Sequence, residues 1–326
     1  MRAPSLSGAR SVFARARGRK ILVAGDLMLD EWIWGTVSRI SPEAPVPVVA
    51  VDGHSFTLGG AGNVANNLRA LGARVTFAGT VGDDAYAQQV RELLRGEQVD
   101  DSGVFTLGAR PTTRKTRVVA HNQQVVRADW EDVSPPRKAD REKVAAFVAR
   151  HAAKSDAVIL SDYAKGLLSR EIVEAALAAP FVLADPKPQN LDLFTGVTCV
   201  APNAHEASVA TGIPIVDERS LEAAGSRLLR RLKCRYVVVT RGEHGMALFG
   251  RDGERLAVPS VARTVFDVSG AGDTVIATLA LALAAGAKIT IATMLANFAA
   301  GAVVEKLGTA TASAREILAL LRHGHG

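Results

Sequence analysis

Short aliphatic runs alternate with longer amphipathic segments along most of the chain. The aliphatic runs have the length and composition of buried strands and span residues 21–24, 75–78, 157–160, 181–184 and 236–240. The amphipathic segments place apolar residues at helical spacing and span residues 64–71, 85–94, 143–152, 169–179 and 221–232. Strands that alternate with helices predict parallel strands joined by crossover helices. We therefore expect an α/β fold with a doubly wound, mostly parallel sheet and helices on both faces.

Two regions break this alternation and predict a second, smaller sheet. Residues from about 35 to 57 contain Pro42, Pro45 and Pro47, and residues from about 110 to 128 are rich in Thr, Val and Arg. Both regions have the composition of strands, with no helix between them. We expect them to form a small β-sheet that stands off the main body as a lid. No linker divides the chain, so residues 1–326 are expected to form one domain.

Ligands of doubly wound sheets bind beyond the carboxyl ends of the parallel strands. The residues that follow the predicted strands are therefore candidates for a binding site. They are Gly25-Asp26, Ser161-Asp162, Asp185-Pro186-Lys187 and Arg241-Gly242. All of them should lie along one rim of the sheet.

The segment Asp267-Val-Ser-Gly-Ala-Gly-Asp-Thr274 joins a glycine-rich turn and an acid to an apolar helix at residues 275–285. Gly270 and Gly272 permit a sharp turn and a close approach of the backbone to a ligand. The N–H groups and the positive dipole end of a helix N-terminus suit a phosphate in transfer, and Asp273 would stand where a general base is needed. The alternative is that Asp273 only caps the helix.

A second glycine turn, Leu58-Gly-Gly-Ala-Gly-Asn63, precedes the predicted helix at 64–71. It permits close backbone approach, and Asn63 offers both a donor and an acceptor to a sugar hydroxyl. A tightly packed strand-to-helix turn is the alternative. Neither glycine turn has the third glycine of a dinucleotide-binding motif, and the sequence has no P-loop. If the chain uses ATP, it does so without a P-loop.

Other polar residues at the predicted strand ends have two interpretations each. Asn203 and Glu206 are spaced to hold a hydrated Mg²⁺ with nucleotide phosphates, or to form an N-terminal capping box. Lys165 and Lys187 could neutralise phosphate or be solvated rim lysines. Asp26 and Asp30 follow the first predicted strand, where carboxylates could accept hydrogen bonds from sugar hydroxyls. For Asp30 we favour a helix cap or a surface charge.

Composition narrows the class of protein. The chain has 326 residues, 48% of them hydrophobic, and a formal net charge of +6. The basic residues are dispersed and do not interleave with the few Trp and Tyr residues, which argues against a nucleic-acid surface and favours small anionic ligands.

The apolar stretch at 275–287 is too short for a membrane span. Cys199 and Cys234 lack the spacing of a zinc site or disulfide framework, which is typical of the cytoplasm. We expect residues 1–19 to form a basic N-terminal tail, disordered or a first amphipathic helix.

The two glycine motifs together resemble the signatures of the ribokinase-like carbohydrate kinases. Further segments are similar to the members of that family that phosphorylate heptose 7-phosphate in lipopolysaccharide core synthesis. These segments are Gly25-Asp-Leu-Met-Leu-Asp-Glu-Trp-Ile-Trp-Gly35, Arg39-Ile-Ser-Pro-Glu-Ala-Pro-Val-Pro47, Gly59-Gly-Ala-Gly-Asn-Val-Ala-Asn-Asn67, Ser161-Asp-Tyr-Ala-Lys-Gly166, Asp185-Pro-Lys187 and Val304-Glu-Lys-Leu-Gly-Thr309. They extend over about residues 20 to 310.

The resemblance implies an enzyme that uses ATP and Mg²⁺ to phosphorylate the anomeric hydroxyl of D-glycero-D-manno-heptose 7-phosphate, on the path to ADP-heptose. It assigns Asp273 as the base, with Gly270, Ala271 and Gly272 in the catalytic turn, and the N–H groups of Ala271 to Asp273 as an anion hole. The residues it implies on the nucleotide side are Lys187, Asn203, Glu206, Thr240, Gly242 and Asn297, with Glu206 also at the metal. The residues expected on the sugar side are Asp26, Gly59, Gly60, Asn63, Asp162 and Lys165.

The same resemblance implies a homodimer formed through the lid, in the bacterial cytoplasm. The alternative is a related kinase that acts on another sugar, sugar phosphate or nucleoside. Some relatives continue into a nucleotidyltransferase domain with a His-x-Gly-His motif. This chain ends at His323-Gly-His-Gly326, so we expect another protein to perform the adenylylation.

Overall fold

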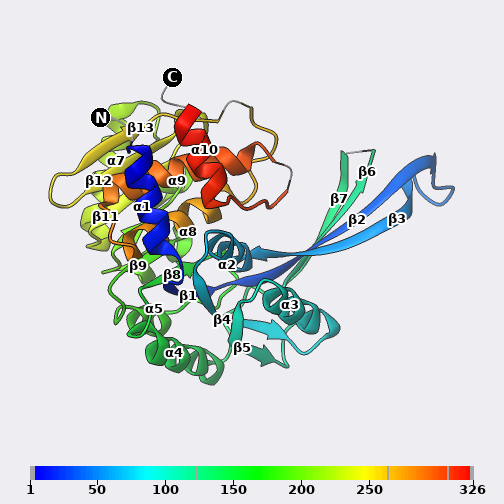
Figure 1. Ribbon diagram of the computed structural model, residues 1–326. Coiled ribbons are helices and arrows are strands. Elements are labelled where there is room, and N and C mark those ends of the chain that lie inside the picture. Colours follow the sequence, from blue (N-terminus) through cyan, green and yellow to red (C-terminus); the bar gives the residue numbers. More distant parts are fainter. Residues whose placement is uncertain (1–3, 122, 263, 307, 324–326) are drawn as a thin grey trace.

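The protein consists of a large layered α/β body and a β-sheet that projects from it, as Figure 1 shows for the computed structural model. The structure describes residues 4–121, 123–262, 264–306 and 308–323. Residues 324–326 of the carboxyl-terminal segment His323-Gly-His-Gly326 thus lie outside the described residues. Among those described, no helix is both long and apolar enough to cross a membrane.

The body is built on a nine-stranded sheet. In spatial order its strands are β13 (Arg255–Val258), β12 (Met246–Gly250), β11 (Tyr236–Thr240), β10 (Cys199–Val200), β9 (Val182–Asp185), β8 (Ala157–Ser161), β1 (Lys20–Gly25), β4 (Arg74–Gly82) and β5 (Asp100–Leu107). All neighbours from β5 to β11 are parallel, whereas β12 and β13 add antiparallel strands at one edge. The expected doubly wound, mostly parallel sheet is confirmed.

Helices cover both faces of this sheet. The helices are α1 (Leu6–Ala16), α2 (Ala61–Ala70), α3 (Ala85–Gly96), α4 (Lys138–Ala152), α5 (Arg170–Ala176), α6 (Ala204–Thr211), α7 (Glu218–Leu232), α8 (Ala271–Ala284), α9 (Ile289–Val304) and α10 (Ala314–His323), with short 3₁₀ turns η1 (Pro188–Phe194) and η2 (Gly242–His244). Alternate residues of β1 show the two layers. Ile21 and Val23 pack with α1, α2 and α8–α10, whereas Leu22 and Ala24 pack with α4, α5 and α7. Because both faces are covered, the strands are continuous apolar runs.

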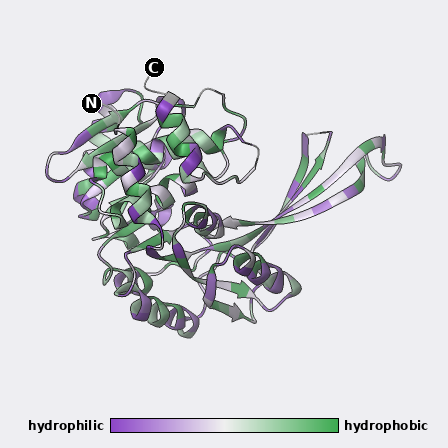
Figure 2. Ribbon diagram, in the orientation of Figure 1, coloured by the Kyte–Doolittle hydropathy of each residue, from purple (hydrophilic) through white to green (hydrophobic). Residues whose placement is uncertain are grey.

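The projecting sheet has the strand order β3 (Pro47–Gly60), β2 (Leu27–Ile40), β6 (Arg114–Ala120) and β7 (Gln123–Trp130). The two predicted lid regions therefore pair with each other through β2 and β6, which are parallel. Strand β2 begins earlier than expected, at Leu27, because its first residues are buried in the body. Along the projecting part, polar and apolar positions intermix (Figure 2), and β7 is exposed over its whole length.

The amino-terminal segment is a helix and not a disordered tail. Ser5 caps α1 through its side chain, which accepts a hydrogen bond from Gly8 N. The apolar face of α1, with Val12 and Phe13 buried, packs against α8 and α10, and Arg15 Nε donates to the Ala285 carbonyl at 2.8 Å. The amphipathic-helix alternative is the correct one, because an apolar residue every three or four positions gives the segment a face to bury.

Candidate active site

Helix α8 begins in the late glycine turn. Gly270 is its N-cap, with φ +77°, a conformation that L side chains rarely adopt. A Cβ on Gly270 would also lie 2.5 Å from Asn63 Nδ2, so the second glycine turn lies directly against the first. Asp273 is in the first turn of α8, is 4% exposed and makes no capping hydrogen bond. The interpretation of Asp273 as a simple helix cap is therefore wrong.

Two side chains from distant parts of the chain hold the Asp273 carboxylate. Asn63 Nδ2, on α2, donates to Oδ2 at 2.8 Å, and the Tyr163 hydroxyl donates to Oδ1 at 2.5 Å. Burial raises the pKa of Asp273 to about 6, against the hydrogen bonds from Tyr163 and Asn63, which lower it. Burial and the nearby Asp273 charge raise the pKa of Tyr163 well above its usual value, so its hydroxyl remains a donor. A carboxyl with a pKa near 6 is suited to accept a proton at neutral pH.

The loop after β8 presents both Tyr163 and Lys165, and two buried carboxylates fix its shape. Asp26 accepts hydrogen bonds from the N–H groups of Tyr163, Lys165 and Leu167 at 2.8–3.3 Å. Asp162 accepts from Ala164 N at 2.8 Å and from Lys187 N and Asn190 Nδ2. Ala164, at the centre of the loop, has φ +56°. These bonds hold a backbone conformation that is costly for alanine.

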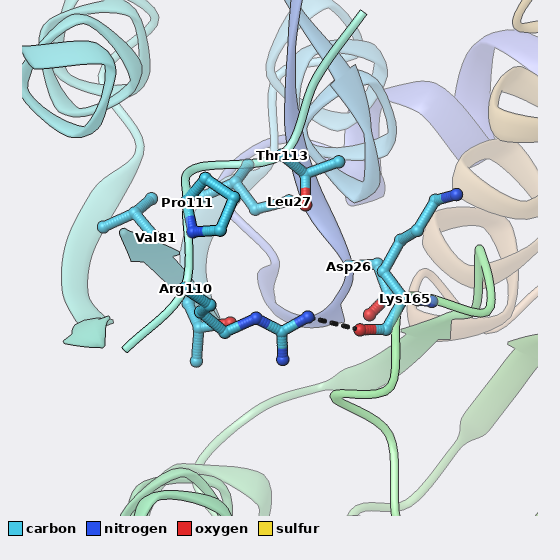
Figure 3. Close-up of a pocket in the computed structure, with 8 residues that line it drawn as sticks. Asp26, Leu27, Val81, Arg110, Pro111, Thr113 and Lys165 are labelled. Atoms are coloured by element: carbon cyan, nitrogen blue, oxygen red, sulfur yellow. Dashed lines mark hydrogen bonds between the residues drawn. The ribbon is translucent and has the colours of Figure 1, made fainter. Parts of the chain in front are cut away.

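Asp26 and Asp162 are therefore not placed as the sequence predicts. Both are buried, and their oxygens are used by the protein's own N–H groups, so they shape the site instead of presenting free acceptors to a sugar. Burial raises the pKa of each of these two carboxyls. Figure 3 shows the small pocket beside Asp26, where Arg110 donates to the Lys165 carbonyl at 3.0 Å. The Lys165 ammonium points away from the Arg110 guanidinium (Figure 3).

The sequence favours a helix cap or a surface charge for Asp30, and this prediction is wrong. It lies within β2, is buried, and pairs with Arg117 Nη1 at 2.6 Å. A Cβ on Gly59 would lie 2.4 Å from Asp30 Oδ2, so Gly59 allows the carboxylate to fit against the early glycine turn. The charge of Asp30 also raises the pKa of Asp273, which places the two acids in one site.

Asp273 also lines a cavity of about 280 Å³. Its lining residues are Tyr163, Asp185, Lys187, Ala201, Asn203, Glu206, Thr240, Val268, Gly270, Gly272 and Asp273. The predicted nucleotide-side residues Lys187, Asn203, Glu206 and Thr240 are thus brought together. Gly242, in η2, does not line this cavity, and Asn297, on α9, donates its side chain to the Pro259 carbonyl at 2.8 Å.

The electrostatics of this cavity centre on one lysine among acids. Lys187 Nζ lies 2.5 Å from Glu206 Oε1. Burial alone would lower the pKa of Lys187, but Asp185 and Glu206 raise it above its usual value. Burial and the Glu206 charge raise the pKa of Asp185 well above its usual value. Asn203 and Glu206 form a complete capping box at α6, so the capping-box interpretation of this pair is confirmed. Both residues also line the cavity.

Tyr163 was not among the candidates from the sequence, and Asp30 was a candidate that we did not favour. Tyr163 is 110 positions from Asp273, and no local pattern indicates that its hydroxyl reaches the acid. For Asp30 a signal existed: it lies in a segment without helix periodicity, so a helix cap was inconsistent with its surroundings.

Comparison with protein families matches residues 19–316 to the pfkB family carbohydrate kinases. The chain belongs to this family. It is 47% identical over 320 residues to the "Bifunctional protein HldE" of Geobacter metallireducens, covering 97% of this chain and 65% of that protein. It is 43% identical to the HldE of Geobacter sulfurreducens, covering 97% and 66%. The pfkB-family chain therefore spans about two thirds of the length of these curated relatives.

Solved structures show the same pfkB-family fold at lower identity. Ribokinase of Arabidopsis thaliana, complexed with ribose and ATP, matches with a TM-score of 0.73 and 21% identity over 94% of this chain and 99% of that chain. Phosphofructokinase-2 of Escherichia coli, in complex with potassium, matches with a TM-score of 0.79 and 19% identity over 95% and 100%. At these identities the likeness establishes the fold.

Proposed function

We propose that this pfkB-family kinase transfers the terminal phosphoryl group of ATP to the anomeric hydroxyl of D-glycero-D-manno-heptose 7-phosphate, giving the 1,7-bisphosphate. The similarity to HldE proteins and the heptose-kinase segments of the sequence support this substrate. The observation that carries the proposal is Asp273, a buried acid with a pKa of about 6. It contacts Asn63 on the side proposed for the sugar, and it lines the cavity that contains Lys187 and Glu206. The product would serve ADP-heptose and lipopolysaccharide synthesis in the bacterial cytoplasm.

In this mechanism Asp273 accepts the proton of the acceptor hydroxyl as the new O–P bond forms. A hydroxyl is a poor nucleophile at neutral pH, so a positioned base is needed. Asn63 and Tyr163 orient the carboxylate, and Asp30 with the Gly59 turn lies on the side from which a sugar would approach. We propose Asp30 as the sugar-side acid in place of Asp26, because within the described residues only its Oδ1 has a hydrogen-bond partner, Arg117, whereas both oxygens of Asp26 accept from backbone N–H groups.

The negative charge of the transferred group requires donors at the start of α8. Ala271 N donates to the Val268 carbonyl at 3.2 Å. Within the described residues, the N–H groups of Gly272 and Asp273 have no such partner and remain for an anion. We therefore propose a narrower anion hole than the predicted run from Ala271 to Asp273. Lys187 supplies a positive charge in the same cavity.

The nucleotide-side cavity fits a hydrated Mg²⁺. Asp185 and Glu206 are hard oxygen donors that face it, and Asp185 has no side-chain hydrogen bond or ion pair within the described residues. The Glu206 charge raises the pKa of Asp185, a repulsion that a cation would relieve. No group of three or more His, Cys, Asp or Glu is arranged to ligate an ion directly in the part of the chain described. Asp185 and Glu206 would thus hold Mg²⁺ through water, where it neutralises phosphate charge.

A substrate panel tests the proposed function. ADP release would be measured with ATP and Mg²⁺ against heptose 7-phosphate, fructose 6-phosphate, ribose, fructose and adenosine. We expect the highest kcat/KM for heptose 7-phosphate, and Asp273→Asn should remove the activity with every acceptor. Preference for a different sugar or nucleoside would overturn the substrate and keep the kinase. A properly folded chain that releases no ADP with any acceptor would overturn the kinase activity as well.

A further inference from the structure

The face of the lid that carries Asp30 also carries a cluster of opposite charges. Strand pairing places Asp30, Lys115 and Asp129 in one row across β2, β6 and β7. The next row contains Trp32, Arg117 and Arg127. Because paired residues of neighbouring strands point to the same face, these side chains share the Asp30 side of the lid.

Within this cluster, Glu131 lies between two ammonium groups. Lys165 Nζ is 2.7 Å and Lys115 Nζ is 3.8 Å from Glu131 Oε2, and Lys115 also contacts Asp129 at 2.9 Å. The two lysine side chains are each 16% exposed. The Glu131 oxygen is buried and has no well-aligned hydrogen bond among the described residues. It is therefore held there by charge and not by a specific donor.

The cluster borders the sugar side of the base. Lys165 is two residues after Tyr163, which contacts Asp273, and the N–H groups of both residues donate to the same oxygen of Asp26. Asp30 is close enough to raise the pKa of Asp273. The cavity with Lys187 is lined by Asp273 but not by Lys165 or Lys115. Lys165 and Lys115 thus lie away from the cavity assigned to ATP.

We propose that Lys165 and Lys115 bind the distal phosphate of a sugar phosphate substrate, and that Glu131 holds their ammonium groups in place until it arrives. This inference rests on the proposed function, because it assumes a sugar phosphate acceptor. Four cations of the cluster, Lys115, Lys165, Arg117 and Arg127, face three acids, Asp30, Asp129 and Glu131. The ion pairs of this nearly balanced cluster hold the partly buried lysine side chains in place without a ligand.

A phosphate can replace Glu131 because it offers more charge and more acceptors. A phosphate monoester carries close to two negative charges at neutral pH and three acceptor oxygens, whereas Glu131 offers one charge at one poorly aligned oxygen. Both lysines can turn their flexible side chains toward the new anion. A sugar without the phosphate leaves Glu131 in place and gains nothing from the lysines. The cluster would therefore select phosphorylated over plain sugars.

The test compares Lys165→Met, Lys115→Met and Glu131→Gln with the full-length protein. Lys138→Met is the matched control, because the Lys138 side chain is 79% exposed on α4, where it pairs with Glu142. For each variant, KM is measured for heptose 7-phosphate, for heptose without the phosphate and for ATP. The dissociation constant of inorganic phosphate is measured separately by calorimetry, a readout that does not depend on turnover.

Each lysine variant should raise KM for the sugar phosphate and weaken phosphate binding by roughly 10- to 100-fold, the loss expected for a charged hydrogen bond. KM for heptose and for ATP should not change. Glu131→Gln should bind phosphate more tightly than the unaltered protein, an effect that a purely structural role would not produce. Lys138→Met should behave as the unaltered protein.

Two results would overturn the inference. The first is an active enzyme in which Lys165→Met changes neither phosphate binding nor the preference for the phosphorylated sugar. The second is a Glu131→Gln variant that weakens phosphate binding as much as the lysine variants do. An unaltered chain that turns over no sugar phosphate but still binds inorganic phosphate through Lys165 would overturn the proposed function and keep the anion site.

Discussion

Burial and hydrogen bonding act in opposite directions on the carboxyl of Asp273. Burial in the apolar start of α8 raises its pKa, and donation from Tyr163 and Asn63 lowers it, with a result of about 6. A base with this pKa is deprotonated at neutral pH and still basic enough to accept a proton. The function of this residue therefore depends on two neighbours that belong to other parts of the chain.

The first prediction concerns Tyr163. In Tyr163→Phe the carboxylate of Asp273 loses a donor at 2.5 Å, so the pKa of Asp273 should rise by about one unit. Less of the base is then deprotonated at a given pH, and the acidic limb of kcat/KM should move to higher pH, with recovery of activity at alkaline pH. Profiles from pH 5 to pH 9 for both proteins provide the measurement. A uniform loss at every pH would indicate a packing role only.

The second prediction concerns the stability cost of Asp273 itself. Its pKa is raised from 3.8 to about 6, so the folded state binds the proton more tightly than the unfolded chain does. The stability it contributes is present below pH 4 and is lost as pH rises through about 6. Asp273→Asn should thus raise the free energy of unfolding at pH 8 by on the order of 1–3 kcal/mol, with little difference near pH 4.

The same Asp273→Asn variant should lose about 10²- to 10⁴-fold in kcat. Urea unfolding at pH 4 and pH 8 and ADP release at pH 8 together check both effects. Equal stabilisation at the two pH values would show that the buried charge is not its cause. Retention of normal turnover would show that another group is the base.

At the scale of elements, two helices begin in glycine turns that contact each other. Gly270 at the start of α8 lies against Asn63 of α2, and the Thr274 hydroxyl donates to Asn67 of α2 at 2.8 Å. Asn67 in turn donates to the Asn63 carbonyl at 2.9 Å. Asp273, the proposed base, and the Asn63 side chain that contacts it are thus held by the packing of one helix N-terminus on another.

The third prediction tests this contact with Gly270→Ala. The change imposes a strained φ and places a Cβ 2.5 Å from Asn63 Nδ2, so it should move Asn63 away from Asp273 and lower kcat at least tenfold. Gly253→Ala is the control, since Gly253 has φ +94° but open space around its Cβ position. Both variants should lose about 1–2 kcal/mol of stability from strain. Equal kcat for the two would contradict the role of the contact.

The amino-terminal helix and the 161–167 loop show how elements far from the base support the site. Helix α1 packs on α8, the helix that carries Asp273. The loop is held by Asp26 and Asp162, whose carboxylates replace the backbone partners that a regular element would supply. These acids therefore fix the positions of Tyr163 and Lys165, through which we expect them to affect the proposed reaction.

At the scale of the whole molecule, the lid exposes apolar side chains far from the body. Trp34, Ile40, Val46 and Val51 on or between β2 and β3 are all more than two fifths exposed, and so are Val126 and Trp130 on β7. Large exposed apolar side chains on a projecting sheet favour an interaction with another protein surface. The proposed partner is the lid of a second copy of the chain.

The fourth prediction is that the chain is a dimer in solution. Ile40 and Val51 are each 61% exposed, and the double variant Ile40→Glu with Val51→Glu should give monomers because buried, unpaired carboxylates would oppose association. Val216→Glu is the control, since Val216 is 83% exposed on the body before α7. Analytical ultracentrifugation measures the masses. A monomeric unaltered protein, or a dimer that persists in the double variant, would contradict this interface.

Much of the architecture follows from local patterns. The aliphatic runs predict the central strands, the loss of helix periodicity predicts the lid, and the parallel topology predicts that strand ends meet at one rim. The short strand β10 and the antiparallel strands β12 and β13 were not predicted, because so few residues carry little periodic signal. Asp273 and Asn63 could be singled out because glycine turns before helices have a visible spacing.

The choice among the acids could not be made from the sequence. Asp26, Asp30 and Asp162 all follow or enter strands and have similar local surroundings. The hydrogen-bond partners of each carboxylate come from N–H groups and cations more than 80 positions away. Tyr163 N donates to Asp26, and Arg117 donates to Asp30. The sequence by itself therefore determined where strands, turns and the base would be. Only the tertiary structure decided which polar groups satisfy one another and which remain for a ligand, because hydrogen bonds between distant segments compete for the same carboxylates.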